Sequence, residues 1–139
     1  MASGVLLLSL LAGCDTAWRW TTQPFRLRCR LEADPPVLFR MEPRQQQVVE
    51  LDPTTGEVTG TITTFEPPPE LGGGIIDDST VTMTPRQIRW ESSMYRPQFV
   101  RESHAIDLTT LRYTAQWSLQ VDAGPEVSET RKTGRCSRV

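Results

Sequence analysis

Residues 25–31 read Phe-Arg-Leu-Arg-Cys-Arg-Leu, and this stretch decides the fold class. Apolar side chains occupy every second position and alternate with three arginines. A period of two is that of a β-strand, in which successive side chains point to opposite faces of the sheet. The stretch therefore predicts a half-buried strand with one apolar face and one arginine face. Pro35-Pro36 ends it.

Similar short segments follow, each bounded by turn residues. Residues 52–56, Asp-Pro-Thr-Thr-Gly, predict a hairpin turn, because proline suits a type I turn and glycine can take a positive φ. A second hairpin is predicted to turn near Thr109-Thr110, and Pro85 indicates a break or an edge position. Further strands are predicted at Val37–Glu42, Gln46–Leu51, Glu57–Phe65, Thr80–Thr84, Gln87–Glu91, Phe99–Leu108, Arg112–Val121 and Thr130–Val139.

The apolar pattern within these segments indicates which face points inward. Ile88 and Trp90 share one face of their strand, and Tyr113, Ala115, Trp117, Leu119 and Val121 share one face of theirs. No segment shows the spacing of an amphipathic helix, and eleven prolines with nine glycines argue against long helices. We therefore expect an all-β fold, a small antiparallel sandwich or barrel of about eight strands.

The N-terminus carries a different signal. An uncharged apolar run from Val5 leads to Leu11-Ala12-Gly13-Cys14. This arrangement resembles the lipobox of bacterial lipoproteins, in which the cysteine is lipidated and becomes the mature N-terminus. The run is too short to span a bilayer and has the length of a secretory signal core. The resemblance implies a signal peptide at residues 1–13, a lipid-anchored tether at 14–24 and a single β domain at 25–139.

Two alternatives to the lipobox stay open. One is an ordinary cleaved signal peptide, which would release a soluble secreted β-protein. The other is a buried first strand or helix, with Cys14 as a small core residue. Residues 1–4 contain no Lys or Arg, whereas a typical signal peptide begins with positive charge.

The cysteine count bears on the same question. The chain has three cysteines, Cys14, Cys29 and Cys136, and an odd count in an exported protein leaves one thiol unexplained. If Cys14 carries lipid, Cys29 and Cys136 remain to form a disulfide. Such a bridge closes a loop of about 100 residues, which a chain-entropy model values at about 4.7 kcal/mol. It also requires the first and last strands to be neighbours, with Cα atoms about 5.5–6 Å apart.

Charge is unevenly distributed along the chain. The formal net charge is −2, which argues against a dedicated nucleic-acid-binding protein. Residues 45–85 contain seven acids and no Lys or Arg, whereas both ends of the predicted domain are basic. If the two ends pair, either acids from the middle lie against them or the surface meets an anionic partner. The candidate contacts for an anionic surface are Arg26, Arg28, Arg30, Arg135 and Arg138.

Signatures of catalysis are missing from the sequence. His104 is the single histidine, it has no nucleophile motif beside it, and we expect it to be structural or exposed. There is no phosphate-binding loop, dinucleotide fingerprint or metal-ligand spacing. We therefore expect no enzyme activity, no catalytic residues, no cofactor and no bound metal. A weak hydrolase that uses His104 is the competing hypothesis.

Phe25-Arg26-Leu27-Arg28-Cys29 and Gly134-Arg135-Cys136 loosely resemble small periplasmic β-proteins in which an early strand cysteine bonds to one near the C-terminus. Membrane-anchored inhibitors of C-type lysozyme share this plan of lipobox, small β-barrel and disulfide. Their inhibitory loop motif, Ser-Gly-Ala followed by an aromatic residue, is absent, and no site residues are carried over.

Three hypotheses about function follow. The first is a membrane-anchored extracytoplasmic lipoprotein with a non-catalytic binding or envelope role, whose partners besides the membrane are an envelope protein or an anionic polysaccharide. The second is an inhibitor of a cell-wall hydrolase that acts through the loop Glu66–Asp78. The third is the hydrolase hypothesis. The sequence defines neither a ligand nor an oligomeric state.

Overall fold

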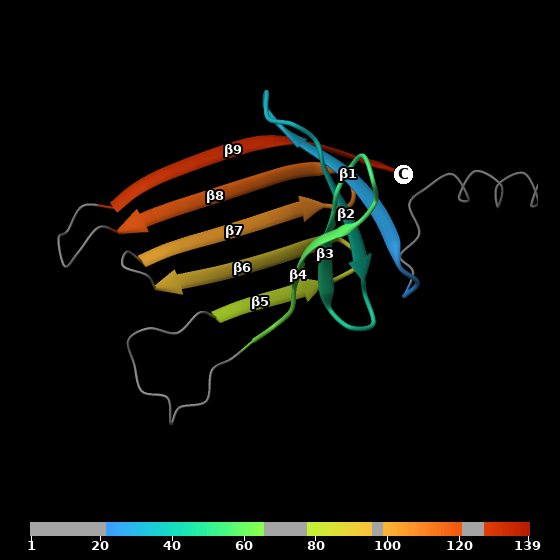
Figure 1. Cartoon of the computed structure of the whole chain (residues 1–139), viewed down its shortest axis with the longest axis horizontal. Coiled ribbons are helices and arrows are strands. Elements are labelled where there is room, and N and C mark those ends of the chain that lie inside the picture. The colour runs from blue at the N-terminus through green and yellow to red at the C-terminus, as the bar shows by residue number, and fades with distance from the viewer. Residues whose placement is uncertain (1–21, 66–77, 96–98, 121–126) are drawn as a thin grey trace, which may run out of the picture.

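The computed structural model describes residues 22–65, 78–95, 99–120 and 127–139. This part of the chain is all β, with nine antiparallel strands in one sheet of order β4-β3-β2-β1-β9-β8-β7-β6-β5 (Figure 1). The strands are β1 Phe25–Leu31, β2 Val37–Glu42, β3 Gln47–Leu51, β4 Val58–Ile62, β5 Asp78–Met83, β6 Gln87–Tyr95, β7 Phe99–Asp107, β8 Arg112–Gln120 and β9 Val127–Arg138.

Each of the nine strands overlaps a predicted segment, so the all-β antiparallel prediction is confirmed, and the total of about eight was one short. Three strands differ from their predicted bounds by more than two residues. β6 and β9 run longer than predicted because their partners β7 and β8 pair with them along the added residues. β4 ends at Ile62, short of the predicted Phe65, because its pairing with β3 stops at Val48 opposite Ile62.

The sheet curls until its two edge strands, β4 and β5, approach each other. An isolated bridge joins Phe65 to Ser79, and the Thr64 hydroxyl accepts from the Val81 N–H at 3.0 Å. The Gln46 side chain, from the turn between β2 and β3, accepts from the Met83 N–H at 2.7 Å. These contacts satisfy edge groups of β5 that would otherwise be open to pairing. The sheet is therefore barrel-like and nearly closed, and β1–β4 cross one end of the longer strands (Figure 1).

Two hairpin turns use the same local chemistry. Asp52 accepts hydrogen bonds from the backbone N–H groups of Thr54 and Thr55, and Gly56 follows at φ 75° as predicted. Asp107 accepts in the same way from Thr109 and Thr110. These backbone hydrogen bonds hold the pKa of both carboxyl groups below the ordinary value. An Asp-x-Thr-Thr sequence thus sets both turns.

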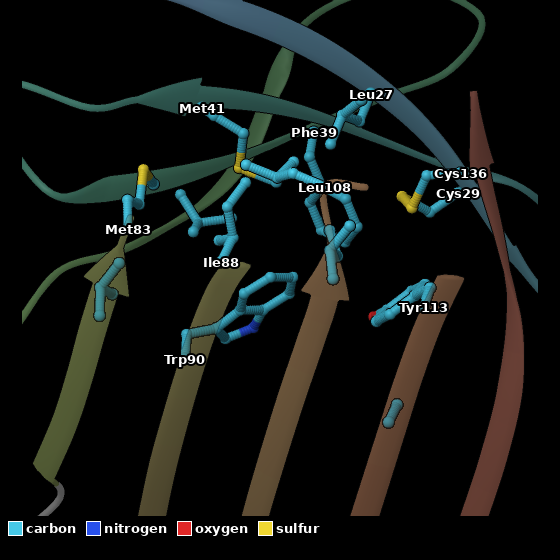
Figure 2. Close-up of a cluster of buried hydrophobic side chains, with 14 of the residues drawn as sticks. Leu27, Cys29, Phe39, Met41, Met83, Ile88, Trp90, Leu108, Tyr113 and Cys136 are labelled. Atoms are coloured by element: carbon cyan, nitrogen blue, oxygen red, sulfur yellow. A yellow bond between two sulfur atoms is a disulfide. The ribbon is translucent and has the colours of Figure 1, made fainter. Parts of the chain in front are cut away.

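The sheet has two halves, β1–β4 and β5–β9, and the core fills the space between them (Figure 2). β1 shows the alternation predicted from its sequence, since Leu27, Cys29 and Leu31 are buried and its arginines are exposed. Phe39 of β2 meets Trp90 of β6 edge to face, with ring centroids 5.3 Å apart. Phe39 and Trp90 come from opposite halves of the sheet, so this contact ties the halves together.

The predicted Cys29–Cys136 disulfide is present and joins β1 to β9 (Figure 2). The two residues lie directly opposite each other, with Cα atoms 4.0 Å apart. This separation is shorter than expected, because Cys136 directs its N–H to Leu111 and the pair is a non-hydrogen-bonded one, the closer kind in an antiparallel ladder. Such a bridge is typical of proteins outside the reducing cytosol.

The predicted signal peptide, Cys14, most of the tether at 14–24 and most of the loop Glu66–Asp78 lie outside the described residues. Where the structure does describe the chain, no helix is long and apolar enough to cross a membrane.

Candidate ligand-binding cavity

A cavity of about 240 Å³ lies between the two halves of the sheet, next to the disulfide. Its buried residues include Phe39, Trp90, His104 and Tyr113, while Pro35 and Glu50 are exposed. The buried rings therefore form the floor, and the exposed residues mark the mouth. The full lining comprises Cys29, Leu31, Asp34, Pro35, Val37, Phe39, Glu50, Ile62, Trp90, Glu102, His104, Tyr113 and Trp117.

Strand register explains why residues distant in sequence meet in this cavity. Trp90, His104 and Ala115 lie opposite one another on β6, β7 and β8 and face inward. Glu102 and Trp117 form the next inward pair along β7 and β8. From the other half, Phe39 and Glu50 are paired across β2 and β3.

His104 is buried, and both of its ring nitrogens are engaged. Nδ1 lies 2.6 Å from the Tyr113 hydroxyl, and Nε2 lies 2.7 Å from Glu102 Oε1. An ionised Glu102 can only accept, so Nε2 donates to it, while Nδ1 and the Tyr113 hydroxyl share the second hydrogen bond. The ring stacks on Trp90, with centroids 4.7 Å apart and planes 9° from parallel. The single histidine is thus a fully partnered side chain in the core.

The acid–base properties of this network favour fixed protonation states. The hydrogen bond from His104 is the main reason why the pKa of Glu102 lies below its ordinary value, and Trp117 adds a smaller lowering. Burial raises the pKa of Tyr113 far above its usual value, and the charges of Glu102 and Glu50 raise it further. At neutral pH Glu102 is therefore an anion, and Tyr113 keeps its proton.

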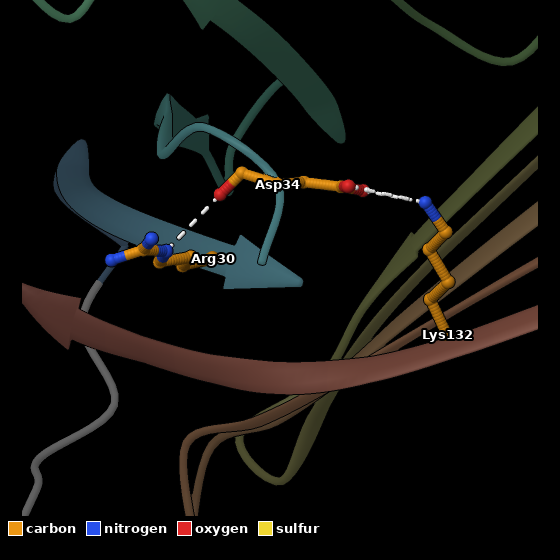
Figure 3. A network of polar contacts seen from close by, with 3 residues as sticks. All are labelled: Arg30, Asp34 and Lys132. Atoms are coloured by element: carbon orange, nitrogen blue, oxygen red, sulfur yellow. Dashed lines mark hydrogen bonds and ion pairs between the residues drawn. The ribbon is translucent and has the colours of Figure 1, made fainter. Parts of the chain in front are cut away.

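Two further carboxylates line the cavity, and they differ in their partners. Asp34 accepts from Lys132 Nζ at 2.9 and 3.1 Å, and its backbone carbonyl accepts from Arg30 Nε at 3.1 Å (Figure 3). The charge of Asp34 is therefore offset. For Glu50, no partner of the carboxylate is found in the described part of the chain. Among the described residues, neither Lys nor Arg lines the cavity.

The predicted basic surface is partly assembled by the pairing of β1 with β9. Arg30 lies directly opposite Arg135, and Arg135 lies opposite Arg112 of β8, so three arginines cross three neighbouring strands. On the side of β1 that pairs with β2, Arg26 lies opposite Arg40. On the side that pairs with β9, Arg28 lies opposite Ser137, and Leu27 lies opposite Arg138. Within the described ranges, no acid from residues 45–85 forms an ion pair with Arg26, Arg28, Arg30 or Arg135.

Sequence reasoning did not predict the cavity. Period two places Glu102 and His104 on the same face as Ile106, which is a signal that two polar side chains point inward. Tyr113 and Trp117 were predicted to point inward, and they do line the cavity. The contribution of Glu50 and Phe39 from the other half depends on how the sheet curls, which the alternation does not encode.

The hydrogen bond between Glu102 and His104 makes the free energy of unfolding depend on pH. The folded-state pKa of Glu102 is depressed, so its contribution is complete above about pH 4.5 and is lost as pH falls through the folded-state pKa. We expect Glu102→Gln to flatten the acid side of the curve of unfolding free energy against pH, measured by urea unfolding from about pH 6 to 3.

Asp52 and Asp107 also lose their stabilising contribution at low pH, and they do so in both wild type and variant. The difference in unfolding free energy between the two proteins therefore reports on Glu102 alone. Glu91→Gln is the matched control, because Glu91 is exposed on the opposite face of β6. Equal acid slopes for wild type and Glu102→Gln would contradict the assigned role of Glu102.

Comparisons with protein-family models, curated proteins and solved structures find no match for this chain. Within the described ranges, no group of three or more His, Cys, Asp or Glu side chains could hold a metal ion. The fold and cavity define a disulfide-closed, barrel-like β domain with an aromatic, acid-lined interior.

Proposed function

We propose that the protein is a membrane-anchored extracytoplasmic lipoprotein with a non-catalytic binding role. The observation that carries the proposal is the Cys29–Cys136 bridge, which leaves Cys14 as the one cysteine outside the domain's own disulfide. A structural disulfide supports an oxidising compartment. The lipobox-like Leu11-Ala12-Gly13-Cys14 supplies both an export signal and a site for the lipid.

The exposed arginines support a membrane-facing orientation. β1 begins at Phe25, only eleven residues after Cys14, so the anchor and the arginine face of β1 are close in the chain. Arg28, Arg30 and Arg135 are exposed on adjacent strands. Each basic side chain near an anionic surface contributes about 1 kcal/mol. Contact with anionic headgroups or an anionic polysaccharide would thus reinforce a single lipid anchor.

The His104 network favours binding over catalysis. A nucleophilic tyrosine needs a lowered pKa, whereas burial raises that of Tyr113. A histidine acting as general base needs a free nitrogen, whereas both nitrogens of His104 are occupied within the domain. These features support a cavity that holds a ligand without reacting with it.

Replacing Cys14 tests the anchor. In a bacterial host fed a labelled fatty acid, we expect the wild type to carry label and to sediment with membranes. Cys14→Ala is expected to lose the label and move to the soluble fraction, because it lacks the sulfur that receives the lipid.

Arg28→Gln/Arg30→Gln is the companion variant, expected to keep the label but to leave the membrane more readily at low salt and with less dependence on salt, because the charges that salt screens are removed. A wild type without label would reject the anchor in favour of an ordinary signal peptide if it is cleaved and soluble, or of a retained N-terminus if it still begins at Met1.

A further inference from the structure

We propose that the internal cavity binds the ammonium group of a small organic cation. The inference deepens the binding role proposed above and does not depend on the lipid anchor. It rests on the combination of aromatic rings and carboxylates in one small cavity, whose lining within the described ranges includes no Lys or Arg.

The charge of the lining favours a cation. Three carboxylates line the cavity, and Lys132 offsets only Asp34. Glu102 is an anion held by His104, and Glu50 stands at the mouth without a partner among the described residues. The same two charges add to the rise in the pKa of Tyr113, whose main cause is burial. The negative charges of the lining would repel an anion and attract a cation.

The aromatic lining favours an organic cation over a metal ion. Four rings from three strands line the cavity, those of Phe39, Trp90, Tyr113 and Trp117, and cations with a diffuse charge are attracted to ring faces. Trp117 is half-buried, and its ring meets His104 edge to face at 5.9 Å. A small metal ion would need several oxygen ligands at short range, whereas alkylated ammonium can contact rings directly.

The size of the cavity restricts the ligand. Its volume of about 240 Å³ lies below the range of about 300–1,000 Å³ that is usual for drug-sized ligands. An ammonium group with a few carbons fits this space, and a longer substituent would extend past the exposed Pro35 and Glu50.

The test compares two probes of matched shape. Full-length protein is titrated with choline chloride and, separately, with 3,3-dimethylbutan-1-ol, the neutral carbon isostere of choline, by isothermal titration calorimetry. We expect choline to bind at least about tenfold more tightly than the isostere, because only choline gains from the carboxylates and the ring faces.

Three variants locate the site. Trp117→Leu is expected to weaken choline binding by about 2- to 30-fold, and Glu50→Gln by several-fold. Glu50 is exposed, so its variant folds even if Trp117→Leu loses stability. Glu91→Gln removes the same charge from the other face of the sheet and is expected to leave binding unchanged.

Equal binding of the two probes would overturn the inference in favour of a purely apolar cavity. Absence of choline binding, or an equal loss of affinity in Glu50→Gln and Glu91→Gln, would also overturn it. None of these results bears on the anchor, which the fatty-acid labelling of Cys14 tests separately.

Discussion

Replacing Cys29 and Cys136 together with alanine is expected to lower the free energy of unfolding by about 2–5 kcal/mol. The bridge joins residues 107 positions apart, so without it the unfolded chain gains the freedom of a very long loop. For a domain of this size, the loss corresponds to a fall in melting temperature of about 10–20 °C. Circular dichroism during thermal unfolding measures it.

Both cysteines are also core residues, so the variant removes some packing as well as the cross-link. Thermal unfolding of the unchanged Cys29/Cys136 protein with and without reductant separates the two effects. The comparison is made in a Cys14→Ala background to prevent thiol exchange. If reduction left the melting temperature unchanged, the bridge would have no stabilising role, and the main support for an oxidising compartment would fail.

Gly134→Ala is expected to cost about 3 kcal/mol or more and to lower the melting temperature by at least about 10 °C. Gly134 lies on β9 opposite Leu31, and a Cβ at this position would overlap the backbone carbonyl oxygen of Arg30. That contact is with backbone, so a side-chain rotation cannot relieve it. β1 and β9 must separate beside the disulfide to accommodate the methyl group.

Gly60→Ala is the matched control, because Gly60 also lies within a strand and a Cβ there would be 4.0 Å from its nearest neighbours, atoms of Glu50. We expect this variant to be neutral or slightly stabilising, since alanine loses less conformational freedom on folding. Equal melting temperatures for the two variants would show that β1 and β9 do not approach each other as closely as described.

The strands and their inward faces could be predicted because each is encoded locally. Residues 25–31 alternate so regularly that β1 has the predicted bounds and burial. The Asp52 turn was predicted because proline and glycine occupy positions with distinct backbone requirements. The neighbouring positions of β1 and β9 followed from cysteine counting, which is a long-range constraint visible in one sequence.

Closure of the sheet and the cavity could not be predicted, because both depend on contacts between distant segments. The side chains of Gln46 and Thr64 accept hydrogen bonds from backbone N–H groups at the edge of β5, where a neighbouring strand would otherwise do so. No local sequence pattern indicates this role. Glu50 shares an exposed, charged character with many surface residues, and only the curl of the sheet brings it to the cavity. For the same reason, Arg112 was not predicted to join Arg30 and Arg135.

We propose above that a disulfide-closed β domain is attached to a membrane through Cys14. Intact mass spectrometry of the protein purified from a bacterial host, with and without reductant, tests both parts at once. We expect a species that starts at Cys14, carries acyl chains and gains the mass of two hydrogen atoms on reduction. A species that starts at Met1, without lipid and with three free thiols, would contradict it.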